Sequence, residues 1–220
     1  MKSEKISDAV VRRLPVYLRF LNELSRREVP TVSSQELGQK LDLNPAQIRK
    51  DLAYFGDFGR KGIGYDVSYL IEKIRQILNL DQQINVALIG AGNLGQALSN
   101  YNAYLKDNMK IVAVFDASPE KIGSQINNIT IQPIEVLVDA VKGNHIRIGI
   151  ITVPDVEAQR VADQLVAAGI EAILNFAPTI LKVPAGVRVH AADFTTDLIS
   201  LAYYLDGGKE RSEHDSKMVD

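Results

Sequence analysis

INVALIGAGNLG, residues 84–95, predicts a buried β-strand that runs directly into a tight turn and then a helix. Within this stretch, Gly90-Ala91-Gly92-Asn93-Leu94-Gly95 matches the pattern Gly-x-Gly-x-x-Gly. In that pattern Gly90 makes the turn off the strand, Gly92 lets backbone approach a pyrophosphate, and Gly95 lets the helix pack closely on the strand. The helix then points unpaired N–H groups and its positive dipole end at the phosphates.

An acidic residue follows the next apolar run at the spacing expected of a ribose-binding carboxylate. Lys110 to Phe115 predicts a second strand, and Asp116 ends it 21 residues after Gly95. A carboxylate there accepts hydrogen bonds from a ribose diol, whereas the 2′-phosphate of NADP(H) would meet its negative charge. These residues predict a site for NAD(H). The alternative is a strand-end aspartate beside a purely structural glycine turn.

Length and composition limit the remaining possibilities. A chain of 220 residues with 46% apolar side chains can bury one full core and has room for one additional small domain. There is no cysteine, which excludes disulfides and zinc sites built on sulfur, and no metal site is predicted. No apolar run has the length of a membrane span, and residues 1–13 contain no signal core. We expect a cytoplasmic protein without membrane contact.

Charge is distributed unevenly along the chain. Residues 1–80 carry 14 Lys and Arg against 10 Asp and Glu, whereas residues 81–220 carry 11 against 17. The first part is therefore at +4 and the second at −6, as in a nucleic-acid module joined to an acidic body.

The basic part contains the helix start and stop signals of a helix-turn-helix. A first helix is predicted from Val10 to Glu28, with Pro15 tolerable only near a helix start or a kink. Ser33 and Glu36 form a capping box that opens a second helix ending at Leu41. Asn44-Pro45 supplies an N-cap and a proline at the first helical position of a third helix, Ala46 to Phe55. Two short capped helices around a tight turn indicate a helix-turn-helix.

The third helix has the two faces of a recognition helix. Its inner face carries Ile48, Leu52 and Phe55. Its outer face combines small, basic and aromatic residues, namely Ala46, Lys50, Ala53 and Tyr54, flanked by Gln47 and Arg49. Such a face suits a helix in the major groove, although an ordinary solvated face has a similar composition.

A basic hairpin supports the DNA-binding interpretation. Residues 56–65 can fold as a short β-hairpin with Arg60 and Lys61 at its tip, like the wing of a winged helix-turn-helix that reaches phosphates or the minor groove. An amphipathic helix, Val67 to Leu80, then leads to a domain boundary at about residues 79–83. The candidate DNA-binding residues are Ser33, Gln47, Arg49, Lys50, Tyr54, Arg60, Lys61 and Gly62.

Strands and helices alternate beyond Asp116, which predicts an α/β fold with a parallel sheet. The predicted elements are a helical turn at Pro119–Gly123, a strand at Thr130–Ile131, a helix at Pro133–Val141, a strand at Ile146–Val153, a helix at Asp155–Ala168, and strands at Ile170–Phe176 and Val187–His190. Ligands bind outside the carboxyl ends of parallel strands. The segments expected there, besides the glycine loop and Asp116, are Thr152-Val153-Pro154 and Asn175-Phe176-Ala177-Pro178.

The C-terminal segment predicts an unpartnered helix. Phe194, Leu198, Leu201, Ala202 and Leu205 recur at helical spacing, and no later element follows to cover them. We therefore expect this helix to pack on a second subunit. The predicted domains are residues 1–80, 81–194 and 195–206, followed by a disordered tail at 207–220.

Four motifs taken together resemble the Rex family of redox-sensing transcriptional repressors. They are Arg49-Lys50-Asp51-Leu52-Ala53-Tyr54-Phe55-Gly56, Lys61-Gly62-Ile63-Gly64-Tyr65, the glycine loop and Asn175-Phe176-Ala177-Pro178. The resemblance covers about residues 5–206. It implies a winged helix-turn-helix, a Rossmann-like parallel-sheet domain, and a C-terminal helix exchanged between the subunits of a homodimer.

The resemblance also implies a function and three switch residues. Members of the family bind inverted-repeat operator DNA, are released by NADH, and bind NAD+ competitively without release. Asp193 would pair with Tyr101 in the NADH-bound state and with Arg19 in the DNA-binding state, while Phe194 would lie against the nicotinamide. A dry pocket around Phe194 would penalise the cationic oxidised ring, which is our hypothesis for how the two cofactors are distinguished.

Two other functions fit parts of the sequence. An NAD-dependent dehydrogenase would need a substrate domain for which too little chain remains, and His145, His190 and His214 are poorly placed as proton donors. A winged-helix repressor whose second domain binds coenzyme A or another nucleotide remains open on spacing alone.

Overall fold

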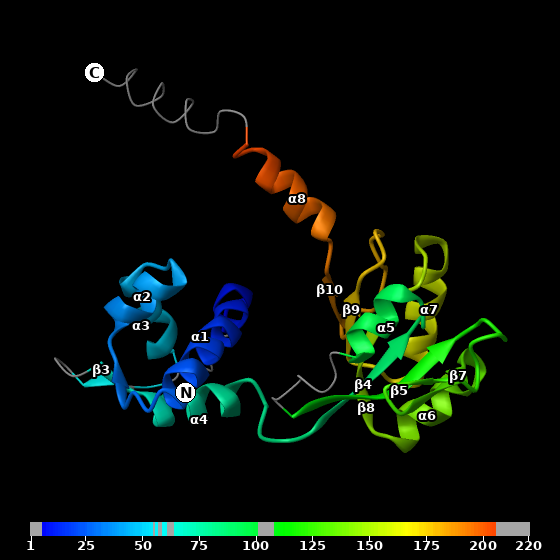
Figure 1. The fold of residues 1–220 in the computed structure, drawn as a ribbon, viewed down its shortest axis with the longest axis horizontal. Coiled ribbons are helices and arrows are strands. Elements are labelled where there is room, and N and C mark those ends of the chain that lie inside the picture. Colours follow the sequence, from blue (N-terminus) through cyan, green and yellow to red (C-terminus); the bar gives the residue numbers. More distant parts are fainter. Residues whose placement is uncertain (1–5, 55, 57–58, 61–63, 101–107, 206–220) are drawn as a thin grey trace. The chain divides into compact units, whose positions relative to one another are not determined.

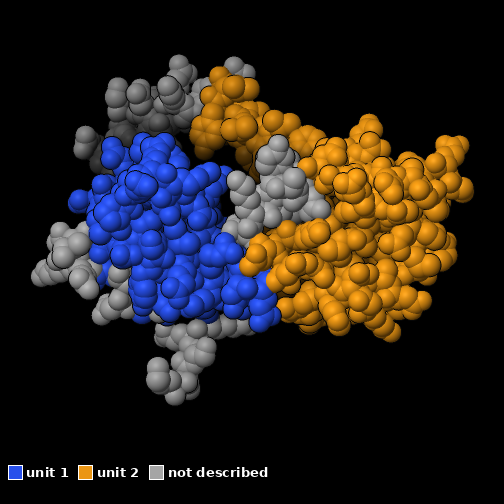
Figure 2. Space-filling model, turned by 60° about the horizontal axis from the view of Figure 1, so that its bottom comes forward, with its two compact units in different colours: residues 1–82 blue, residues 83–220 orange. Residues whose placement is uncertain are grey.

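The computed structural model describes residues 6–54, 56, 59–60, 64–100 and 108–205 of the chain. The chain divides into two compact units, residues 1–82 and 83–220, which Figure 2 shows in different colours. Phe55, Lys61, Gly62 and Tyr101, which the sequence analysis singled out, lie outside the described residues, as does the predicted tail from residue 207.

The first unit contains the predicted helices. They are α1 (Asp8–Arg26), α2 (Ser34–Leu41), α3 (Pro45–Ala53) and α4 (Val67–Ile77). The Ser33–Glu36 capping box and the Asn44 cap form as expected, because each side chain accepts a hydrogen bond from an otherwise unpaired N–H of the first turn. Pro15 lies in the interior of α1 and not near its start, on the exposed side of that helix.

A small antiparallel sheet completes this unit. Strand β2 (Gly59–Arg60) pairs with β3 (Gly64–Asp66), as predicted for the wing, and β1 (Thr31–Val32) pairs with the other edge of β3. The sequence analysis missed β1, because two residues are too few for an alternating pattern. The largest buried side chains of the unit's core are Leu14, Tyr17, Leu21, Leu37, Ile48, Leu52, Leu70 and Ile74.

The second unit is built on a sheet whose described strands run in the order β10-β9-β8-β4-β5-β7-β6 (Figure 1). The strands are β4 (Ile84–Ile89), β5 (Met109–Asp116), β6 (Gln125–Ile126), β7 (Ile129–Pro133), β8 (Ile146–Ile151), β9 (Ala172–Asn175) and β10 (Arg188–Ala191). All neighbours pair in parallel except β6 and β7. Because β4 has β5 on one side and β8 on the other, the strand order reverses at β4, where α/β sheets place their ligands.

Helices cover both faces of this sheet. In β4 the side chains of Ala87 and Ile89 join a core with α6 (Leu137–Gly143) and α7 (Asp155–Ala168). The alternate residues Val86 and Leu88 face the other side, where Leu98 of α5 (Asn93–Asn100) packs. Burial on both faces explains why the strand sequence is continuously apolar.

Several predicted boundaries differ from the structure. The helix predicted from Pro133 is a short 3-10 turn, η2 (Ile134–Val136), followed by α6, because Pro133 itself ends β7. Strand β8 stops at Ile151, before the Thr152-Val153-Pro154 loop. The hairpin of β6 and β7 was missed, since only a short strand at Thr130–Ile131 was expected. The antiparallel β6 makes the sheet mixed at that edge.

Candidate functional sites

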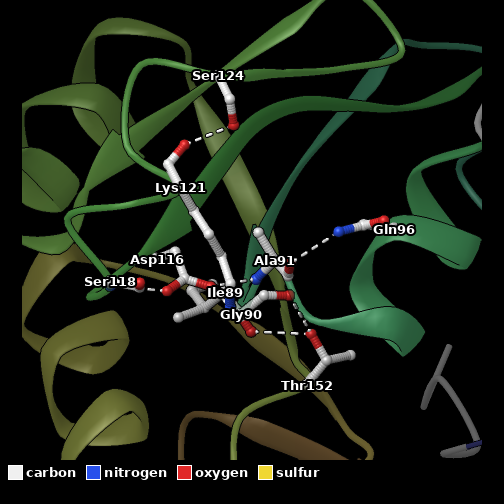
Figure 3. Close-up of polar contacts among 9 residues, drawn as sticks. All are labelled: Ile89, Gly90, Ala91, Gln96, Asp116, Ser118, Lys121, Ser124 and Thr152. Carbon is white, nitrogen blue, oxygen red and sulfur yellow. Dashed lines mark hydrogen bonds and ion pairs between the residues drawn. The ribbon is translucent and has the colours of Figure 1, made fainter.

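The three motif glycines make the loop after β4 possible, and Figure 3 shows the first of them, Gly90. Gly90 has φ +103°, and a Cβ on it would lie 2.8 Å from the carbonyl oxygen of Thr152. A Cβ on Gly95 would overlap the carbonyl oxygen of Gly90, so glycine is what allows α5 to begin against the end of β4. Gly92 has no atom within 4 Å of the Cβ position and leaves backbone open to a ligand. These contacts match the roles predicted for the motif.

Asp116 organises the neighbouring strand end, as Figure 3 shows. Its Oδ2 accepts hydrogen bonds from the N–H of Ala91 (2.7 Å) and from Lys121 Nζ (3.1 Å), and its Oδ1 accepts one from the N–H of Ser118 (2.8 Å). Burial raises the pKa of Asp116, but these donors outweigh it and hold the pKa below its ordinary value. The charged carboxylate therefore fixes the glycine loop at the place predicted for a ribose.

A pocket of about 630 Å³ opens at the carboxyl ends of β4, β5 and β8. It brings together the predicted residues Gly90, Gly92, Asp116, Thr152, Val153 and Pro154, and it adds Lys121, Glu157 and Arg160, which the sequence analysis missed. The Thr152 hydroxyl donates to the carbonyl oxygens of Ile89 (3.0 Å) or Gly90 (2.8 Å), which ties the β8 loop to the glycine loop. The volume and the largely aliphatic lining suit a nucleoside.

The segment after β9 follows the carboxyl end of that strand, and its contact with a ligand stays a prediction. Asn175 is buried, and its amide donates to the carbonyl oxygens of Ala177 (3.0 Å) and Thr179 (2.9 Å) while its oxygen accepts from the N–H of Ala177 (3.0 Å). Asn175 thus shapes its own loop, Ala177 is buried, and Phe176 packs on the core shared with β4. None of these three lines the pocket described above.

The outer face of α3 exposes most of the predicted DNA-binding side chains. Lys50 is exposed, and Tyr54 follows the helix with 41% of its surface accessible. Arg49 donates to the Ser34 hydroxyl (2.9 Å), which links α3 to α2, and the Ser33 hydroxyl caps α2. Of the wing, the backbone of Arg60 is described and pairs with Gly64.

The structure also reveals a buried charged group on α3 that sequence reasoning missed. Asp51 is fully buried, and its carboxylate accepts hydrogen bonds from Arg13 and Tyr17 of α1 and from Gln47 of α3 itself. Burial raises the pKa of Asp51, but the three donors together hold it below its ordinary value. The available signal was helical spacing, because Asp51 shares the inner face with Ile48 and Leu52.

Of the predicted switch residues, Arg19 and Asp193 are described, and both are exposed. Arg19 lies on α1 in a groove of about 530 Å³ that is also lined by Arg26, Lys40 and the ion pair of Arg27 with Glu23 (2.6 Å). Asp193 caps α8 (Phe194–Ala202), accepting from the N–H of Thr195 (3.0 Å) and the hydroxyl of Thr196 (2.8 Å). Phe194 is 73% exposed.

Helix α8 buries none of its side chains against the described residues. Its exposed apolar residues, with those of the turn that follows, are Phe194, Leu198, Ile199, Leu201, Tyr203, Tyr204 and Leu205. A contiguous surface of this kind marks an interface. In the described part of the chain no cluster of His, Asp and Glu is placed to hold a metal ion, and no helix there is long and apolar enough to cross a membrane.

A winged helix joined to a dinucleotide-type α/β unit defines the class of protein, a DNA-binding regulator that responds to a nucleotide ligand. The chain is 62% identical over 204 residues to the redox-sensing transcriptional repressor Rex of Brevibacillus brevis, an alignment that covers 93% of this chain and 99% of the relative. The chain therefore belongs to the Rex family of redox-sensing transcriptional repressors.

Other comparisons agree with this assignment. Rex of Roseiflexus sp. is 44% identical over 215 residues, covering 98% of each chain. A crystal structure of "RSP in complex with beta-NAD+ and operator DNA" superposes with a TM-score of 0.88 at 39% identity, covering 98% of this chain and 99% of that one. A complex of RSP with beta-NADH gives a TM-score of 0.84 at 39% identity, covering 97% and 98% of the two chains. These relatives are repressors and not enzymes, which sets aside the dehydrogenase alternative.

Two family models match the chain in parts. One described as "Putative DNA-binding protein N-terminus" matches residues 5–53, and one described as "CoA binding domain" matches residues 81–179. The division agrees with the two units of the structure.

Proposed function

We propose that the chain acts as a cytoplasmic homodimer that represses transcription and senses the ratio of NADH to NAD+. Its two winged helices bind an inverted-repeat operator, and NADH in the pocket of the second unit releases the DNA. One observation carries this proposal: the chain that presents the basic face of α3 also holds a glycine-loop pocket closed on one side by Asp116.

The pocket supports NAD(H) over NADP(H). Asp116 is charged and lies at the end of the strand next to the glycine loop, where the adenosine ribose is held in such folds. A 2′-phosphate would add two negative charges beside that carboxylate. Thr152, Val153 and Pro154 supply a largely apolar wall on the β8 side.

Helix α8 supports the dimer. Burying its large apolar side chains on a second subunit would contribute about 1.5–3 kcal/mol for each one fully covered. In this arrangement Phe194 moves from solvent to the nicotinamide, and a dry site there favours the neutral reduced ring over the cationic oxidised one.

Asp193 provides the connection to DNA binding. It pairs with Tyr101 when NADH is bound and with Arg19 when DNA is bound, so the cofactor biases a two-state equilibrium through one carboxylate. The cations that surround Arg19 favour an incoming aspartate. Unlike the nucleotide pocket, this groove lies wholly in the DNA-binding unit.

Titration of the purified protein with NADH, NAD+, NADPH and coenzyme A tests the choice of ligand. We expect NADH to bind more tightly than NADPH by roughly a hundredfold, about 2.7 kcal/mol, because of the charge on Asp116. Asp116→Asn should narrow that difference. The match to a "CoA binding domain" favours coenzyme A as the second candidate ligand. If coenzyme A bound more tightly than NADH, coenzyme A would be the ligand of the pocket and our proposal would be wrong.

A further inference from the structure

The buried carboxylate of Asp51 is saturated with hydrogen bonds. Oδ2 accepts from Arg13 Nε (2.6 Å) and Tyr17 Oη (2.7 Å), and Oδ1 accepts from Arg13 Nη2 (2.8 Å) and Gln47 Nε2 (2.6 Å). A carboxylate provides about four acceptor positions, and here each one has a donor. The two donors from α1 hold Asp51 at a fixed place on the inner side of α3.

This arrangement determines which way the carboxamide of Gln47 points. A charged carboxylate only accepts hydrogen bonds, so Gln47 must turn its nitrogen toward Asp51 and its oxygen away from it. Within the residues that the structure describes, the Gln47 side chain makes no other hydrogen bond, and the residue is half-buried at the edge of the exposed face. Its Oε1 is therefore an acceptor directed away from the buried carboxylate.

Gln47 occupies a reading position on the helix. It is the third residue of α3, and the N-terminal residues of a recognition helix contact base edges in the major groove. A glutamine that turns both groups of its amide to the DNA pairs with adenine N6 and N7. With one N–H of Nε2 donated to Asp51, the orientation of the Gln47 amide is fixed, and Oε1 is the acceptor left to contact DNA.

We infer that Asp51 is a positioning residue that fixes the Gln47 amide with Oε1 directed away from the buried carboxylate, so that Gln47 selects a base with an exocyclic amino group in the major groove. The groups that fit are cytosine N4 and adenine N6, whereas guanine and thymine offer only acceptors at the equivalent position. This inference rests on the proposed function, in that α3 enters operator DNA.

The test measures binding of the wild-type dimer and Gln47→Met to operators in which each base pair of both half-sites is varied. We expect wild type to prefer cytosine or adenine at one position in each half-site by roughly tenfold, and Gln47→Met to lose that preference alone. Replacing the selected base by an analogue that lacks the amino group should weaken wild type and leave Gln47→Met unchanged. Gln39→Met is the matched control, since it makes the same substitution at an exposed glutamine of α2 and should retain the preference.

Asp51→Asn tests the positioning role. Asparagine can donate to Gln47 Oε1, which lets the glutamine amide reverse, so the preference for an amino-bearing base should fall while Gln47 itself is intact. Thermal unfolding shows whether Asp51→Asn is folded. If it is not, Gln47→Met and the base analogues still test whether Gln47 selects a base with an exocyclic amino group. The inference would be overturned if Gln47 conferred a preference for guanine or thymine. It would also be overturned if Gln47→Met weakened binding equally whichever base pair of the operator was varied. Failure of wild type to bind duplex DNA would instead refute the proposed function.

Discussion

Replacing Gly95 with alanine is expected to produce a repressor that NADH no longer releases from its operator. The new Cβ would overlap the carbonyl oxygen of Gly90, so α5 must move away from β4 and take the phosphate-binding N–H groups with it. We expect the affinity for NADH to fall by at least about a hundredfold, or ~2.7 kcal/mol. Operator binding should persist, because the DNA-binding residues lie in the other unit. An operator-shift assay over a range of NADH concentrations measures both effects.

Two further glycines make this prediction specific. Gly143→Ala places a Cβ where no atom lies within 4 Å, and it should respond to NADH as wild type does. Gly92→Ala is equally free of protein neighbours but lines the pocket, so it should fold normally and still lose NADH affinity. The contrary result is that NADH releases both Gly95→Ala and Gly92→Ala from DNA at the same concentration that releases wild type. That result would show that NADH binds outside the glycine-loop pocket.

Placing aspartate at both Leu198 and Leu201 should convert the protein to a monomer that binds its operator weakly. Both leucines are more than half exposed on α8, and two charges in a dimer interface would remain without partners. Because both subunits carry the two changes, the dimer loses the burial of four leucines, which alone removes roughly 8 kcal/mol, or about a millionfold in dimer affinity. Sedimentation velocity gives the oligomeric state, and the operator shift gives the consequence for binding of both half-sites together.

Ser200→Asp is the matched control, since it adds the same charge at an exposed polar position of the same helix. We expect it to remain dimeric. A dimer that survives both leucine substitutions would show that α8 does not form the subunit interface, and the assignment of Phe194 to the partner's nicotinamide would then fail with it.

Local signals in the sequence were sufficient for much of the fold. The caps at Ser33 and Asn44 act within one turn of helix, and α7 ends at Ala168 as predicted, with Gly169 at positive φ just after it. The glycine loop was predictable because each glycine has a separate steric reason to be there. The place of Asp116 beside that loop was predictable from its spacing, and its contact with a ribose stays a prediction.

Features that depend on contacts between residues far apart in the sequence could not be predicted from local sequence signals. Strands β1 and β6 are two residues long and exist only because β3 and β7 lie beside them. Asp51 lies between polar and apolar neighbours in sequence, and its importance comes from Arg13 and Tyr17, which are 38 and 34 residues away. The hydrogen bonds of the Asn175 amide to the backbone of its own turn were likewise not predictable from sequence, and its contact with a ligand stays a prediction.

The most direct test of the account is the occupancy of an inverted-repeat operator by the purified dimer, with NADH at saturation and with no cofactor. We expect the cofactor-free protein to hold the operator, NADH to release it, and an equal concentration of NAD+ to leave it bound. Equal occupancy with and without NADH, in a protein that demonstrably binds NADH, would contradict the claim that the pocket controls the winged helices.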